Sequence, residues 1–258
     1  MDLKLPTHLA KSYKSNSQIA RITTEAWVVE NISCPNCGGA LDEYPANEKS
    51  KDVCCSICST DFQIKSSKNR FSKKITGAEY KTTLNSVLNG NNPSLMLLFY
   101  NEKSMTVIDF QIIHHSFITE KNIIPRKPLS STAKRAGWQG CLIDIDEVPK
   151  IATVFIVKDG IVKNPENLNK KWITSNQAKG LSADSRGWLS DVLSVVDKQP
   201  DNFSLNDIYK HEHYFEALHP NNNNIQAKIR QQLQIIRDMR MIEFANRGEY
   251  HKTGLLNG

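Results

Sequence analysis

The chain has 258 residues, of which 39% are hydrophobic and 23% are charged. This content is sufficient to form hydrophobic cores, and the length predicts two domains or one large domain. No apolar run approaches the roughly 18 residues that a membrane span needs, and the N-terminus lacks the apolar segment of a signal peptide. We therefore expect a soluble, intracellular protein without a membrane partner. The formal net charge of +6 gives weak support for nucleic acid as a partner.

The first predicted element is a helix over residues 12–30. Tyr13, Ile22 and Trp27 belong to a rough apolar stripe at helical spacing. Glu25 lies on the same helix. It either orients a catalytic site or is an ordinary exposed helix carboxylate, and the sequence leaves both interpretations open.

Two Cys-x-x-Cys pairs follow, Cys34 with Cys37 and Cys55 with Cys58, and seventeen residues separate Cys37 from Cys55. This spacing is typical of a four-cysteine zinc site. All four thiolates would bind the metal, so the predicted zinc is structural and leaves no open position for a substrate water. Disulfides or a redox pair are the alternatives, and the lack of a signal peptide disfavours disulfides.

The same stretch carries a possible catalytic pattern. Side chains alternate along the strand predicted after the second pair, so Gln63 and Lys65 share one face. Asp52 on the neighbouring strand would meet them across the ladder. The Asp52 carboxylate and the Gln63 side-chain oxygen would bind one magnesium ion, which takes oxygen ligands. Lys65 would position the attacking water and offset charge that develops on the phosphate. The alternative is a solvated strand face, because short motifs of this kind have many false positives.

A basic run over residues 65–74 comes next and fits either a solvated loop or a contact with phosphates. The following segments are predicted from periodicity and breakers. They are a helix over 77–89, buried strands over 95–100, 105–113 and 151–157, and a polar linker over 164–183.

Residues 121–140 are basic and predict a functional loop. Lys134 and Arg135 are candidates for phosphate contacts. Trp138 either enters a DNA groove and packs against a methyl group, or anchors the loop in the core.

From residue 185 onward the pattern predicts a winged helix. Ser204 and Asp207 form a capping box with the shorter acid at the start of the second helix. Asn246, Arg247 and Gly248 predict the turn of a wing. The third helix buries residues spaced four, four and three apart, and its other face offers the side chains that read guanine and adenine in the major groove. The candidate DNA-binding residues in this part are Gln226, Arg230, Gln231, Gln234, Arg237 and Arg247.

Several segments, distributed from the first helix to the last, carry a family resemblance. They are Tyr13–Gln18, Thr24–Val28, Cys34–Gly38, Arg126–Leu129, Arg135–Trp138, Ser185–Trp188 and Ile229–Gln234. On these segments the chain resembles the DpnI-type methyl-directed restriction endonucleases.

The resemblance implies an α/β nuclease of the restriction-endonuclease-like class over residues 1–183, with a mixed sheet, catalytic magnesium and structural zinc. It also implies a winged-helix DNA-binding domain over 184–258. The implied activity is cleavage of double-stranded DNA at adenine-methylated GATC, by a monomer in the bacterial cytoplasm. The resemblance also favours DNA contact for Trp138.

Two positions depart from the family pattern. Gln63 stands where the family has Glu, and Lys51 stands where Pro precedes the family's aspartate. A glutamine keeps an oxygen for the metal but gives up one negative charge. The alternatives are therefore a non-cleaving sensor of DNA methylation on a decayed nuclease, and a zinc-ribbon transcription factor that ignores methylation.

Overall fold

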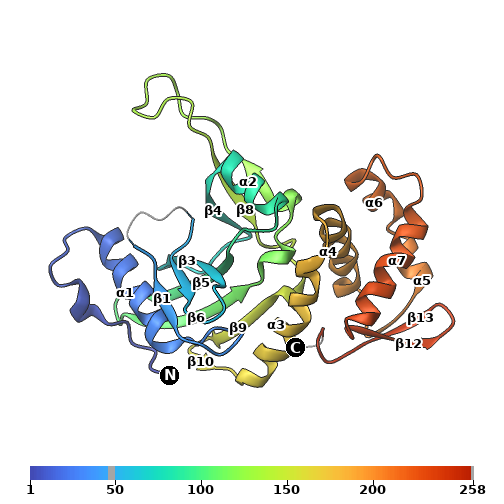
Figure 1. Ribbon diagram of the computed structural model, residues 1–258, viewed down its shortest axis with the longest axis horizontal. Helices are drawn as coiled ribbons and strands as arrows, with labels where there is room; N and C mark the ends of the chain where they lie inside the picture. Colours follow the sequence, from blue (N-terminus) through green and yellow to red (C-terminus); the bar gives the residue numbers. More distant parts are fainter. Residues whose placement is uncertain (46–49, 257–258) are drawn as a thin grey trace.

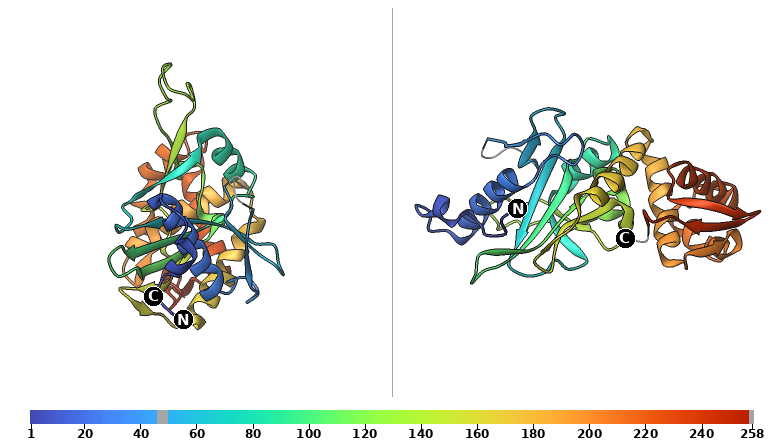
Figure 2. Two further views of the ribbon diagram at one scale, coloured as in Figure 1. Left: turned by 90° about the vertical axis from the view of Figure 1, so that its left-hand side faces the viewer. Right: turned by 90° about the horizontal axis from the view of Figure 1, so that it is seen from below.

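The computed structural model describes residues 1–45 and 50–256. It contains an α/β body followed by a mostly helical body with a β-wing, and the two lie side by side (Figure 1; right-hand view of Figure 2). The predicted class, a mixed α/β sheet followed by a winged helix, is confirmed.

In the part of the chain that the structure describes, seven strands form the main sheet, in the order β1-β2-β3-β5-β6-β9-β10. Their bounds are β1 Leu41–Glu43, β2 Val53–Cys55, β3 Asp61–Ser67, β5 Ser94–Asn101, β6 Thr106–Ile113, β9 Thr153–Lys158 and β10 Ile161–Val162. Strands β3 and β5 run parallel, and the other neighbouring pairs are antiparallel. The hairpin β2–β3 therefore lies beside the central strand β5.

Strand β5 shows why both faces of this sheet are covered. Leu95 and Leu97 point to one face, and Met96 and Leu98 point to the other, because side chains alternate along a strand. All four are at most 2% exposed. Helices α1 (Asn16–Asn31) and α3 (Pro165–Asn176) bury tryptophans in the Met96/Leu98 cluster. The Leu95/Leu97 cluster continues into α2, the smaller sheet and the second body.

The polar linker predicted over residues 164–183 is wrong. This segment contains α3 and a 3-10 helix, Gln177–Gly180. Trp172 of α3 is only 1% exposed and its ring centroid lies 6.0 Å from that of Phe62. One buried indole is enough to dock a helix that is otherwise polar, because full burial of an aromatic ring stabilises by about 1.5–3 kcal/mol.

A smaller sheet holds the projecting loop. It has the order β4-β8-β7, with bounds β4 Lys74–Glu79, β8 Gly140–Asp144 and β7 Ile123–Pro125. Residues 126–139 leave it as a long excursion at the top of Figure 1. The helix expected over 77–89 begins later, as α2 (Tyr80–Leu88), because Glu79 ends β4 and caps the helix by accepting bonds from the Lys81 and Thr82 N–H groups.

The second body is built around α7 (Ile225–Asp238), which packs on α4 (Ala183–Lys198), α5 (Leu205–Tyr209) and α6 (Glu212–Leu218). The predicted wing is present as β12 (Ile242–Asn246) and β13 (Glu249–Lys252). A third strand, β11 (Asn202–Ser204), pairs with β13 and was not predicted. The predicted capping box is confirmed, since Ser204 and Asp207 bond each other's backbone N–H groups.

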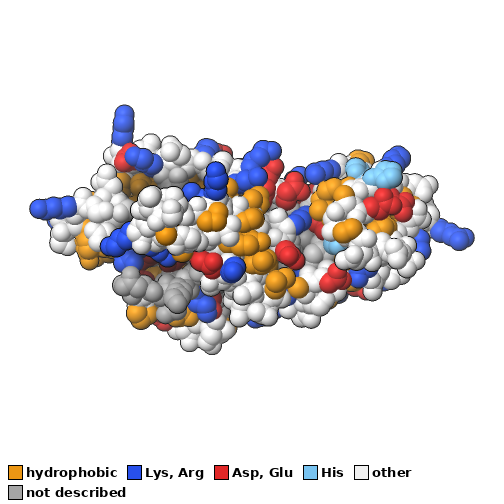
Figure 3. Space-filling model, turned by 90° about the horizontal axis from the view of Figure 1, so that it is seen from above, with side chains coloured by type: hydrophobic (Ala, Val, Ile, Leu, Met, Phe, Trp, Pro, Cys, Tyr) orange, Lys and Arg blue, Asp and Glu red, His pale blue; other side chains and the backbone are white. Residues whose placement is uncertain are grey.

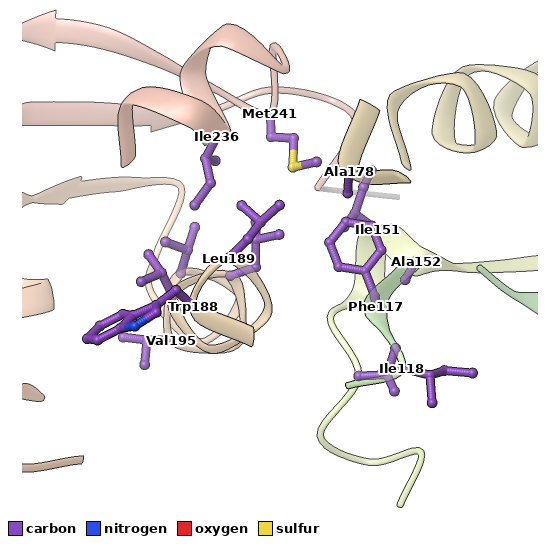
Figure 4. Packing of buried hydrophobic residues seen from close by; sticks show 14 of the residues in the cluster. Phe117, Ile118, Ile151, Ala152, Ala178, Trp188, Leu189, Val195, Ile236 and Met241 are labelled. Atoms are coloured by element: carbon purple, nitrogen blue, oxygen red, sulfur yellow. The ribbon is translucent and has the colours of Figure 1, made fainter. Parts of the chain in front are cut away.

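The two bodies share one hydrophobic cluster at α4. In Figure 4, Leu189 of α4 lies between Ile236 and Met241 of the second body and Phe117 and Ile151 of the first. Each of these five residues is fully buried. Among the described residues, no helix has the length and apolar character needed to cross a membrane.

Candidate active site and zinc site

The four paired cysteines converge at one end of the main sheet. Their sulfur atoms all lie within 4.8 Å of one another, with Cys34 and Cys58 3.7 Å apart and Cys37 and Cys55 3.4 Å apart. Four sulfurs at about 2.3 Å from a tetrahedral zinc would be about 3.8 Å apart. The residues therefore fit zinc, and the donor set is the one that structural zinc sites use.

Local backbone geometry explains the convergence. Cys34 starts a tight turn in which its carbonyl accepts the Gly38 N–H at 2.8 Å, and Gly38 adopts a φ of +76°, which favours glycine. Cys55 starts the second turn, where its carbonyl accepts the Ser59 N–H at 3.0 Å. The Ile57 N–H also points at the Cys55 sulfur, 3.4 Å away. Because β2 and β3 are the arms of this second turn, the cysteine cluster fixes the hairpin that carries Asp52.

Asp52 is half-buried at the start of this hairpin. Its backbone N–H bonds the Phe62 carbonyl, and its Oδ2 accepts the Ile64 N–H at 2.7 Å. Burial raises the pKa of Asp52, while the Ile64 bond and the charges of Lys65 and Arg21 act in the opposite direction. The carboxylate is thus held in place by the backbone of the strand that carries Gln63 and Lys65.

The structure relates Gln63 and Lys65 to Asp52 in different ways. The β2–β3 ladder ends at Val53, which faces Phe62, and Asp52 just before it donates its own N–H to the Phe62 carbonyl. The Gln63 side chain borders a cavity of about 110 Å³ under α2. Burial lowers the pKa of Lys65, and the Asp52 carboxylate counteracts that effect. The charges of Asp52 and Lys65 therefore influence each other, and Gln63 lies two residues before Lys65 on β3.

Asp61 is a further carboxylate on the same face of β3, and it already has two bonding partners. Asp61 accepts a bond from the Tyr44 hydroxyl at 2.8 Å and forms an ion pair with Lys51. Lys51 stands where the family pattern has proline, so this departure supplies a partner for Asp61.

Glu25 lies on α1 near the candidate site. Its side chain is 16% exposed and its Oε1 is 3.8 Å from Arg21 Nε. Burial raises the pKa of Glu25 to about 7, Arg21 lowers it, and Asp52 and Glu43 raise it further. Arg21 was not among the predicted site residues, although its position four residues before Glu25 is the spacing at which helical side chains pair.

We expect Glu25→Gln to make stability less dependent on pH. A carboxyl whose folded pKa exceeds its unfolded value binds more protons when folded, so the unchanged chain loses stability as pH rises from 4.5 to about 7. Relative to it, the glutamine variant should gain about 3 kcal/mol across that window, and no more above it. Urea denaturation of both proteins at a series of pH values measures the difference. A difference that stays constant with pH contradicts the expectation.

The basic run after β3 is largely neutralised by acids. Lys68 pairs with Glu102 at 3.2 Å and Lys73 with Asp146 at 2.9 Å. Lys74 also has an acidic partner, and Arg70 has two. These pairs favour a structural surface loop over a track for phosphates.

The projecting loop carries the other predicted nuclease-side contacts. Lys134 and Arg135 are exposed, and the Arg135 guanidinium lies 4.8 Å from the Trp138 ring centroid. The Trp138 ring is half-buried and lies so close to Gly140 that an added Cβ there would be 2.8 Å from it. Trp138 is therefore held between an arginine and the base of the loop.

The predicted polar face of α7 lies on the surface. Ile225, Ile229, Leu233 and Ile236 are buried, whereas Gln226, Arg230, Gln231 and Gln234 are exposed. Arg230 Nη1 bonds the Tyr209 hydroxyl at 2.6 Å, and Gln226 bonds Glu212 at 2.9 Å. Arg237 is half-buried against Phe244 of the wing and pairs with Asp238. Arg247 is exposed at the wing turn.

Comparison with protein families gives a match for each of the two bodies. Residues 1–181 match the DpnI family, described as the Dam-replacing family, and residues 184–252 match the Dam-replacing HTH domain. The chain belongs to the Dam-replacing family. The resemblance seen in the sequence motifs is thereby confirmed. As a member of the Dam-replacing family, the chain is assigned to the restriction nucleases, with a winged helix for binding DNA.

Proposed function

We propose that this member of the Dam-replacing family is a methyl-directed restriction endonuclease that cleaves double-stranded DNA at adenine-methylated GATC. The observation that carries the proposal is that the Ile64 N–H holds the Asp52 carboxylate at 2.7 Å against the strand that bears Gln63 and Lys65, on a hairpin held by four cysteines. In the proposal the protein acts as a monomer in the bacterial cytoplasm, with zinc as a structural ion.

In this proposal three side chains, Asp52, Gln63 and Lys65, supply the groups for phosphodiester hydrolysis. Asp52 and Gln63 offer oxygen atoms, which are the ligands that magnesium takes. Magnesium bound there would neutralise charge on the scissile phosphate. The Lys65 ammonium would offset the negative charge that grows on the phosphate oxygens and hold the attacking water. Glu25 and Arg21 would keep Asp52 in position from α1.

In this proposal methylated DNA is recognised by two surfaces. The Trp138 loop, with Lys134 and Arg135, would contact the DNA at the nuclease, and Trp138 would pack against the adenine methyl group. The exposed face of α7 would read base edges in the major groove, where arginine pairs with guanine and glutamine with adenine. Arg247 at the wing turn would contact the backbone.

Gln63 supports a second candidate, a protein that binds methylated DNA without cutting it. With glutamine in place of glutamate, the metal site has one negative charge fewer, and metal affinity falls. The fold and both DNA-binding surfaces would serve such a sensor equally well.

One digest separates the two candidates. We expect plasmid DNA from a host that methylates adenine in GATC to be cut when magnesium is added, and unmethylated plasmid to stay intact. Gel electrophoresis after a magnesium series and a manganese series measures the cutting. Tight binding of methylated DNA with no cutting at any metal concentration would favour the sensor.

A further inference from the structure

A basic cleft lies between the two bodies, away from the candidate active site. It has a volume of about 1050 Å³. The first body contributes β9, α3 and the segments before β9 and after β10, and the second body contributes the start of β12 and the segment after β13. None of Asp52, Gln63, Lys65 or the exposed residues of α7 lines the cleft.

The charged side chains around this cleft are almost all positive. Among the lining residues that the structure describes, Glu243 is the one acid, against six cations. The cations are Lys150, Lys158, Lys163, Lys170, Lys171 and Arg240. The local excess of five compares with a net charge of +6 for the whole chain. On the face shown in Figure 3, by contrast, basic and acidic side chains are interspersed.

Most of these cations are available to solvent. Lys150, Lys158, Lys163, Lys170 and Arg240 are all exposed. Described acids form no ion pair with these five side chains, unlike the basic run after β3. Lys158 lies 5.0 Å from the centroid of the Phe155 ring, which leaves its charge unneutralised.

Next to the cleft, one half-buried acid, Asp197, is bonded to the backbone of Lys150. Asp197 Oδ2 accepts the Lys150 backbone N–H at 2.8 Å. Burial raises the pKa of Asp197, and Lys150, Lys252 and Lys171 oppose that shift. Burial lowers the pKa of Lys171, Asp197 raises it, and Lys150 lowers it. Asp197 is therefore engaged by the fold and does not neutralise the exposed cations of the cleft.

We propose that the interdomain cleft binds the phosphate backbone of duplex DNA, independently of base sequence and methylation. Lysines act as point charges for phosphate, and a cleft lined by one sign of charge concentrates the field. The cations come from five separate segments of the chain. Positive charges from this many segments suit a ligand with repeated negative charges, such as the DNA backbone, better than a single small anion. The proposal rests on the proposed function only in taking DNA as the ligand.

The test neutralises three of these lysines at once. In the variant Lys150→Gln/Lys163→Gln/Lys170→Gln, we expect weaker binding to a duplex that contains no GATC, at least about tenfold in dilute salt. The plot of log affinity against log salt should become less steep by about 0.9 for each phosphate that the variant no longer neutralises. Fluorescence anisotropy over a salt series measures both quantities with the full chain.

A matched variant controls for total charge. Lys11→Gln/Lys14→Gln/Lys103→Gln removes three exposed lysines outside the cleft and changes the net charge equally. It should leave the salt slope nearly unchanged. A variant with arginine at positions 150, 163 and 170 should bind as the unchanged chain does, which separates the effect of charge from an effect on folding.

Three outcomes would overturn the proposal. The first is equal affinity and equal slope in the cleft variant and its control. The second is failure of the arginine variant to bind. The third is that inorganic phosphate binds the cleft at low concentration, while replacement of the three lysines leaves the affinity for duplex DNA unchanged.

The plasmid digest by the unchanged chain is a separate readout. Reduced DNA affinity in the cleft variant, together with no digestion by the unchanged chain, would overturn the proposed function and leave the cleft proposal standing.

Discussion

Replacing Cys55 by serine is expected to remove zinc and unfold the hairpin of the candidate active site. Cys55 is 2% exposed, ends β2 and faces the Cys37 sulfur at 3.4 Å. Structural zinc sites bind their metal with about 10–16 kcal/mol, which is comparable to the whole stability of a domain. A site with three thiolates cannot retain that energy, and Asp52 then loses the backbone bond that holds it.

Metal analysis of the purified protein and a thermal unfolding scan measure the effect. The unchanged chain should carry one zinc per molecule, and Cys55→Ser should carry much less and unfold at a lower temperature. Cys54→Ser is the matched control, because Cys54 is the neighbouring residue on the same strand and lies outside the four-cysteine cluster. Equal zinc content and equal unfolding temperatures in the two variants would show that the cluster holds no structural metal.

Local patterns in the sequence predicted much of the fold correctly. The unbroken apolar run in β5 identifies a buried strand, and the capping box at Ser204 identifies the start of α5. The cysteine spacing predicted a cluster that the coordinates bring together within 4.8 Å. Each of these signals is local, because it depends on residues that are close in sequence or on one metal that draws them together.

Features that depend on tertiary packing were not predictable in the same way. Helix α3 has a polar sequence and is docked by Trp172, whose ring partners Phe62 and His114 lie 110 and 58 residues earlier in the chain. Strand β11 exists because β13 offers it a free edge. The basic run after β3 is typical of a phosphate contact until its acidic partners, such as Glu102, are known. Propensity alone does not carry such information.

At the candidate site, too, local features could be predicted from the sequence and tertiary contacts could not. Alternation puts Lys65 on the same face of β3 as Gln63, and the hairpin brings Asp52 onto the backbone of that strand, so the sequence was sufficient to propose the trio. It did not indicate that Asp61 is taken by Tyr44 and Lys51. Whether Gln63 binds the metal depends on the charge of its side chain, which the fold does not determine.

Gln63→Glu is expected to raise the rate of DNA cleavage at low magnesium by about a hundredfold. An added unit charge near a cation is worth about 4 kcal/mol at 4 Å in an effective dielectric of 20, and desolvation of the new carboxylate offsets part of that. Because the introduced glutamate would sit next to Ile64, whose N–H holds Asp52, the gain should be largest where metal is scarce and should shrink as magnesium saturates the site. Initial rates on methylated plasmid over a magnesium series measure it.

Lys65→Ala, made in the Gln63→Glu background, tests whether the gain arises at this site. Removing the charge that offsets the developing phosphate charge should lower the rate at least about a hundredfold, whatever the metal concentration. Lys68→Ala is its control, because Lys68 follows on the same segment but is exposed and paired with Glu102. If Gln63→Glu leaves the protein inert while methylated DNA is still bound, charge at position 63 is not what limits cleavage. If Lys65→Ala and Lys68→Ala lower the rate equally, Lys65 has no special role at the reacting phosphate, and the chemistry must be assigned to other residues.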